Sequence, residues 1–177
     1  MAKIIYKKGM EGQNNLLSIE GIEIDLLNGQ KALIYPKYAE RSMSSKGLGG
    51  LDAALETEFD AMKVEDANDK TQALLKIESP AAEWVSQVSS AAHTIFSLPS
   101  LAAAIEIRHQ MREIDSLAET IPGADLLRNY TSIIWSCSRY SEYSFWGAYD
   151  GYENALYGAA CYEFLAVPVL LYKNLNV

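Results

Sequence analysis

The spacing of apolar residues changes twice along this chain, and no other feature narrows the choice of fold as much. Residues 22–26 alternate between apolar and acidic side chains, and an Asn-Gly pair at 28–29 separates them from the apolar run at 32–35. This pattern predicts a β-hairpin with a two-residue loop in which both loop residues take positive φ. The weaker apolar runs at 4–6 and 16–19 are predicted to add strands.

Helical spacing dominates the middle of the chain. Apolar residues on one helical face predict a helix near 51–62. Ser79-Pro80 predicts a helix start that runs to about residue 89, because Ser caps helix N-termini and Pro fits the first helical position. Ser100 gives the same signal, and helical spacing then continues to Ile121.

Short β-type runs return from Thr131 to the end of the chain. The 177 residues suffice for one domain with a sizeable apolar core, and no repeat or long linker divides them. We therefore predict a single α+β domain over 1–177, with N-terminal strands and a hairpin at 1–50, a helical part at 51–122 and an irregular β region at 123–177.

Charge and composition exclude several classes of partner. The net charge of −8 opposes binding to nucleic acid or to anionic membrane surfaces, which require clustered Lys and Arg. The N-terminal residues lack the apolar stretch of a secretory signal, and no run approaches the roughly 20 residues that span a bilayer. These features predict a cytoplasmic protein.

Candidate catalytic and metal-ligating groups are few. His93 and His109 lie in no recognisable motif, and Cys137 and Cys161 have neither zinc-ligand nor thioredoxin-like spacing. The acidic run at 65–70 lacks the glycine and terminal glutamate of an EF-hand, so a solvated loop is predicted there. No metal, cofactor or enzymatic activity is predicted. The glycines at 46–50 are predicted to form a flexible connector. A solvated helix face is predicted for Glu106, Glu113, Asp115 and Glu119.

The most biased segment is 135–172. Eight of the eleven tyrosines lie between Tyr130 and Tyr172, and no Lys, Gln or Met occurs between Trp135 and Tyr172. Tyr and Trp with Ser and Gly are the combination favoured in antibody-like binding surfaces. The competing interpretation is that these rings fill a β-rich core, and composition alone supports the two equally.

Several motifs, taken in their order along the chain, resemble those of a known group of domains. They are Asp69-Lys70-Thr71-Gln72-Ala73, Leu98-Pro99-Ser100-Leu101, Trp135-Ser136-Cys137-Ser138-Arg139-Tyr140-Ser141 followed by Trp146, and Val167-Pro168-Val169. Together they resemble a bacterial and phage group of C-type-lectin-like domains, which share their fold with formylglycine-generating enzymes. Many members are variable proteins of diversity-generating retroelements, among them phage tropism determinants. The resemblance spans roughly residues 60 to 171.

This resemblance implies a receptor-recognition protein, cytoplasmic or virion-associated, whose C-terminal surface binds an unknown protein or carbohydrate ligand. Adenine-directed diversification of Asn codons cannot produce Glu or Trp, so Glu142, Trp146, Glu153 and Glu163 are assigned to fixed positions. The predicted ligand-binding residues are Ser138, Tyr143, Phe145, Gly147, Tyr149, Asp150, Tyr152, Asn154 and Tyr157, with Trp135, Trp146 and Pro168 as scaffold.

The chain departs from the family pattern at three positions. Cys137 replaces a serine, Phe145 stands where alanine usually precedes the tryptophan, and Val167 replaces a common arginine. Two alternatives therefore stay open: a non-diversified structural or adhesion module of a phage particle or cell surface, and a formylglycine-generating-type oxidase that uses Cys137 and Cys161. A homo-oligomer is compatible with each.

Overall fold

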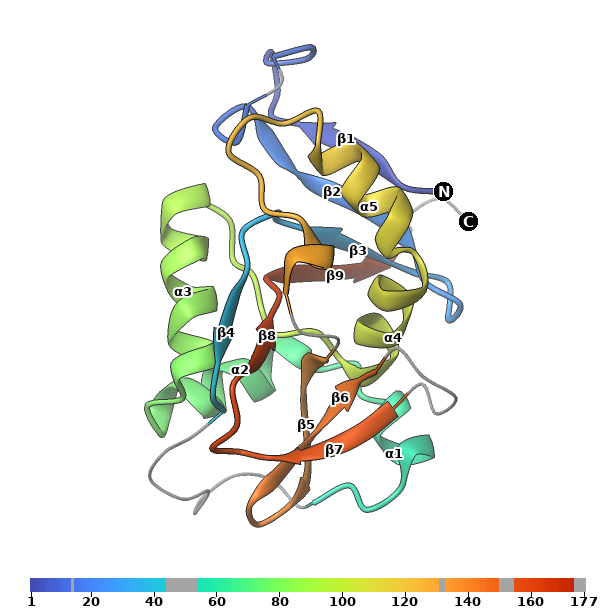
Figure 1. The fold of residues 1–177 in the computed structure, drawn as a ribbon, viewed down its shortest axis with the longest axis vertical. Helices are drawn as coiled ribbons and strands as arrows, with labels where there is room; N and C mark the ends of the chain where they lie inside the picture. The colour runs from blue at the N-terminus through green and yellow to red at the C-terminus, as the bar shows by residue number, and fades with distance from the viewer. Residues whose placement is uncertain (14, 44–53, 131–132, 150–154, 174–177) are drawn as a thin grey trace.

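The protein is a mixed α+β structure, as the apolar spacing predicts. Two β-sheets are flanked by helices (Figure 1). The computed structural model describes residues 1–13, 15–43, 54–130, 133–149 and 155–173. Among these residues, no helix combines the length and the apolar character needed to cross a membrane.

The first sheet joins the two ends of the chain. Its strands are β1 (Lys3–Tyr6), β2 (Ile19–Asp25), β3 (Gln30–Ile34) and β9 (Val169–Lys173), in the order β1-β2-β3-β9 with every neighbouring pair antiparallel. The predicted strand at 4–6 is confirmed. The predicted strand at 16–19 is not, because residues 16–18 form a turn and only Ile19 belongs to β2.

The predicted hairpin is β2 and β3, but its loop differs from the prediction. The Gly29 N–H donates to the Leu26 carbonyl (3.0 Å) and the Leu26 N–H donates to the Gln30 carbonyl (2.9 Å), which closes a three-residue loop. Only Gly29 takes positive φ (80°), because the Asn28 side chain instead accepts the Gln30 N–H at 3.0 Å.

The second sheet has the order β4-β8-β5-β6-β7. Its strands are β4 (Ala39–Arg41), β8 (Phe164–Ala166), β5 (Ile134–Ser141), β6 (Ser144–Ala148) and β7 (Ala155–Ala159). The pair β5–β8 is parallel, and the other pairs are antiparallel. This sheet carries most of the aromatic segment 135–172, and β7 forms one of its edges (Figure 1).

The helices are α1 (Glu58–Met62), α2 (Ala67–Lys76), α3 (Pro80–Ala92), α4 (Leu101–His109) and α5 (Met111–Ala118), with a 3-10 turn η1 (Leu127–Asn129). Two of the helices, α3 and α4, begin where the predicted serine caps place them. The Ser79 and Ser100 hydroxyls accept the N–H groups of Ala82 and Ala103, so both predicted N-caps are confirmed.

Two helix predictions need correction. The helix predicted near 51–62 is shorter: α1 begins at Glu58 with Thr57 as its N-cap, and residues 51–53, like the glycines at 46–50, lie outside the described residues. The loop predicted at 65–70 is wrong, because α2 begins at Ala67. Asp69 lies in the first turn of α2, where its carboxylate interacts favourably with the positive end of the helix dipole. The buried residues of α2 are Ala67, Thr71 and Leu74.

The predicted solvated face at Glu106 and Asp115 is also wrong, since both carboxylates are buried. The Asp115 side chain accepts the backbone N–H groups of Leu127 (2.7 Å) and Arg128 (3.1 Å). It therefore caps η1 from α5 and ties the helical part to the segment that leads into β5.

The four motif stretches meet at the centre of the molecule. The Leu98 N–H donates to the Thr71 hydroxyl (3.0 Å), and the Cys137 N–H donates to the Pro99 carbonyl (2.8 Å). Ser97 and Val169 exchange backbone hydrogen bonds at 2.7 and 2.9 Å. Segments far apart in sequence are thus joined by direct hydrogen bonds around α2, α4 and β5.

Candidate functional site

Three aromatic rings form a cluster on one face of the β5–β6–β7 sheet. Tyr140 and Tyr157 stack with ring centroids 3.8 Å apart and planes 8° from parallel. Trp146 meets both edge-on, 5.2 Å from Tyr140 and 6.0 Å from Tyr157. We call Tyr140, Trp146 and Tyr157 the aromatic cluster. It is half open to solvent, because Trp146 is 7% exposed whereas Tyr157 is 55% exposed.

Strand register explains why these rings share a face. Trp146 pairs with Tyr157 across β6 and β7, so their side chains leave the sheet on the same side. The Trp146 indole N–H donates to the Leu55 carbonyl (2.7 Å), and the Leu55 N–H donates to the Arg139 carbonyl (2.9 Å). Leu55 therefore lies across the cluster and fixes the indole, which in turn fixes the two tyrosine rings.

The opposite face of the same strands belongs to the core. Phe145 and Phe164 pack against Trp135, with centroids 6.4 and 4.5 Å from it. Gly158 faces this group, and a Cβ at that position would collide with the Phe164 ring. The sheet is thus lined with aromatic rings on both faces, one buried and one partly open.

The structure divides the predicted ligand-binding residues into three groups. Tyr143, Tyr149 and Tyr157 are exposed, at 70%, 39% and 55%. Ser138, Phe145 and Gly147 are buried, so their assignment to the ligand surface is wrong. Three others, Asp150, Tyr152 and Asn154, lie outside the described residues. The predicted scaffold residues Trp135, Trp146 and Pro168 are all buried.

Each corrected residue is buried for a local reason. The register between β5 and β6 shifts between Trp135 and Arg139, and Ser138 lies in this buried stretch of β5. Phe145 faces Trp135, and a Cβ on Gly147 would come within 3.0 Å of the Ile134 carbonyl oxygen. Both residues lie in β6, a strand that is buried along its whole length.

Sequence reasoning missed Tyr140, Leu55 and Tyr162. Tyr140 is part of the Trp135–Ser141 motif, so its place in that motif could have marked it. Leu55 gives no such signal, because it reaches the cluster only through long-range hydrogen bonds. Tyr162 is 57% exposed but lies outside the aromatic cluster, next to Phe164 at 6.1 Å.

The Tyr140 phenol of the aromatic cluster is uncharged at neutral pH. A hydrogen bond with the Tyr157 side chain, with smaller contributions from burial and from the Glu56 carboxylate, raises the pKa of Tyr140 above its usual value. A neutral phenol on a partly open ring offers an apolar surface with a polar tip.

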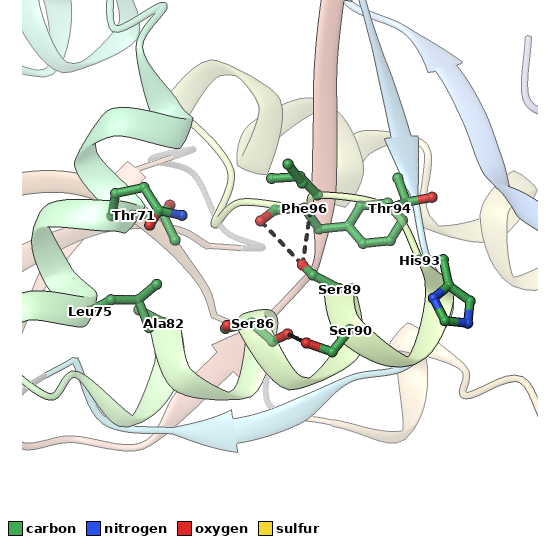
Figure 2. A pocket seen from close by; sticks show the side chains of 11 residues that line it. Thr71, Leu75, Ala82, Ser86, Ser89, Ser90, His93, Thr94 and Phe96 are labelled. Carbon is green, nitrogen blue, oxygen red and sulfur yellow. Dashed lines mark hydrogen bonds between the residues drawn. The ribbon is translucent and has the colours of Figure 1, made fainter.

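A separate cavity of about 320 Å³ lies between α2 and α3 (Figure 2). Most of its polar groups are hydroxyls, and the Ser89 and Ser90 hydroxyls on α3 are already engaged. Ser89 donates to the Val85 carbonyl (2.8 Å) and accepts the Phe96 N–H (2.9 Å), and Ser90 donates to the Ser86 carbonyl (3.0 Å). Among the described residues that line it, none is a carboxylate.

The cysteines and acidic residues supply little further chemistry within the described part of the chain. Cys137 is buried and Cys161 is exposed, and both are free thiols. Burial raises the pKa of the Cys137 thiol to about 12, so that thiol is protonated at neutral pH and is a poor nucleophile. The described residues contain no group of three or more His, Cys, Asp or Glu side chains placed to hold a metal ion.

Comparison with family models, curated proteins and solved structures found no match for this chain. The candidate site is therefore identified from the residues of this chain alone.

Proposed function

We propose that this protein is a ligand-recognition domain that binds a protein or carbohydrate through the aromatic cluster and the neighbouring exposed tyrosines. The observation that carries the proposal is Tyr157, whose ring is more than half exposed although it is fixed by stacking on Tyr140. A large ring that is held in place yet open to solvent can bind without first losing rotational freedom.

The surroundings of Tyr157 support recognition more than catalysis. Trp146 braces the stack from the side, and its own indole is held by Leu55. Rigid aromatic anchors of this kind dominate the energetics of many protein interfaces. Tyr143, on the β5–β6 turn, and Tyr149, at the end of β6, add further exposed phenol groups in the same segment of the chain.

We further propose a C-type-lectin-like fold of the kind found among retroelement variable proteins. The family-like motifs support this, because their residues join one another through the hydrogen bonds of Thr71 with Leu98 and of Pro99 with Cys137. Residues that hold the frame together are the ones a family would share, whereas exposed residues on the frame are free to vary.

Binding is tested with the wild-type protein on a glycan array and on an array of peptides of varied charge. Tyr157→Ala is compared with Tyr162→Ala, a matched control because the two tyrosines are equally exposed while Tyr162 lies outside the cluster. We expect Tyr157→Ala to abolish the wild-type signals and Tyr162→Ala to retain them. Absence of any wild-type signal, or equal loss in both variants, would refute the proposal.

Diversification is tested by sequencing this locus across a population. Positions 143, 149 and 157 are exposed and are expected to vary, whereas Phe145 and Gly147 are buried and are expected to stay constant. Equal variation at exposed and buried positions, or no variation in the segment, would contradict diversification and would favour a fixed structural or adhesion module.

A further inference from the structure

Strand β7 (Ala155–Ala159) is an unusual edge. It ends the second sheet, and within the described part of the chain no strand pairs with its outer side. Its sequence, Ala-Leu-Tyr-Gly-Ala, contains neither a charged residue nor a proline. Natural sheets commonly protect their edges with such residues, because an exposed edge offers free N–H and C=O groups to another chain.

The other sheet edges of this molecule are protected in that way. Edge strand β1 carries Lys3 and has a register shift between Ile5 and Tyr6, and β9 carries Lys173. In the second sheet, β4 carries Glu40 and Arg41. Among the four edge strands, β7 alone lacks a charge, and it is also the strand that carries Tyr157.

Acidic side chains lie near one end of this neutral edge. The described residues between 139 and 163 include two acidic residues, Glu142 and Glu163, and one basic residue, Arg139. Glu142 and Glu163 are exposed near one end of β7, where the Ala160 N–H donates to the Tyr143 carbonyl (2.7 Å). The Glu56 carboxylate lies close enough to Tyr140 to affect its pKa. An incoming strand would therefore meet negative charge around an uncharged backbone edge.

We propose that the ligand of this domain is an extended, basic peptide segment that pairs with the outer edge of β7 and places a Lys or Arg side chain over Tyr157. This inference rests on the proposed function and names its ligand class. Main-chain pairing supplies affinity that is independent of sequence, and the alternate side chains supply specificity. Tyr157 provides the ring face for a cation, and Glu142 and Glu163 attract the remaining positive charges.

The test uses a fluorescein-labelled peptide of about ten alternating Lys and Thr residues, long enough to span the strand. Its binding to the full chain is measured by fluorescence anisotropy, with a Glu-Thr peptide of equal length as the charge control. Two further probes carry backbone N-methyl groups on all Lys residues or on all Thr residues. In a strand, alternate N–H groups point to the same side, so only one methylated set faces β7.

We expect the Lys-Thr peptide to bind and the Glu-Thr peptide not to bind. One N-methylated probe should lose affinity by about tenfold or more and the other by less than about twofold, a difference that electrostatic attraction alone does not produce. The Glu142→Gln/Glu163→Gln double variant should weaken binding of the Lys-Thr peptide without changing its dependence on methylation.

Equal affinities for both methylated probes would overturn strand pairing. If these probes failed to bind while array ligands still required Tyr157, this inference would be wrong and the proposed function would stand. If Tyr157→Ala bound every array ligand as the wild type does, the proposed function itself would be wrong.

Discussion

Replacing Trp146 with Phe tests whether the indole holds the aromatic cluster in place. The change removes the hydrogen bond from Nε1 to the Leu55 carbonyl (2.7 Å), and it shortens a ring that is 7% exposed. A hydrogen bond of this kind contributes about 0.5–1.5 kcal/mol. The lost ring atoms leave a cavity of roughly 40 Å³, which costs about 1 kcal/mol.

Together these changes predict a loss of about 2 kcal/mol in the free energy of unfolding. For a chain of 177 residues, each kcal/mol lowers Tm by about 2–4 °C, so Tm should fall by roughly 4–8 °C. Urea unfolding followed by circular dichroism measures the free energy, and a thermal scan measures Tm.

Trp84→Phe is the matched control. Trp84 is partly buried, its indole N–H has no hydrogen-bond partner among the described residues, and the Arg41 guanidinium lies 5.3 Å from the centroid of its ring. Its replacement should change the free energy of unfolding by less than about 1 kcal/mol. Equal stability of Trp146→Phe and wild type, or equal losses in the two variants, would refute the assigned role of Trp146.

Three other perturbations test the frame around the site. Asp115→Ala leaves the buried Leu127 N–H and the partly buried Arg128 N–H without an acceptor and should cost about 2–4 kcal/mol in urea unfolding. The exposed Glu113→Ala should cost less than about 0.5 kcal/mol. Gly158→Ala should destabilise the protein through a collision with the Phe164 ring, and adding Phe164→Leu should restore part of the lost stability. If the losses in free energy of unfolding of the two single variants simply added in the double variant, this contact would be contradicted. Burial raises the pKa of Glu23, but hydrogen bonds from Tyr172, Lys31 and Lys3 outweigh it and hold that pKa below its usual 4.5. The stability that this carboxylate contributes is present above about pH 4.5 and is lost as pH falls through the lower pKa of the folded state. Glu23→Gln should therefore reduce the fall of the urea unfolding midpoint at acidic pH. The same fall in the variant and the wild type would contradict this role of Glu23.

Local signals in the sequence predicted local structure well. The β2–β3 hairpin follows from alternation around Asn28 and Gly29, and α3 and α4 begin where Ser79 and Ser100 cap them. These signals succeed because turns and caps are decided by residues within a few positions of one another. The start of α2 was missed because only three of its ten residues are buried, so polar side chains dominate its sequence.

The candidate site could be predicted only in part. Alternation shows which side chains share a face of a strand, but it does not show whether that face is covered. Both faces of β6 are covered, which buries Phe145 and Gly147, whereas Tyr157 lies on the edge strand and stays open. The contact of Leu55 with Trp146 joins residues 91 positions apart, and no local pattern announces it.

The most direct test of the aromatic cluster as the binding surface is tyrosine nitration with and without a bound array ligand, mapped by mass spectrometry. In the free protein, Tyr157 and Tyr162 should react to similar extents because their exposures are nearly equal. A saturating ligand should protect Tyr157 and leave Tyr162 reactive. Unchanged nitration of Tyr157 in the complex would contradict the account.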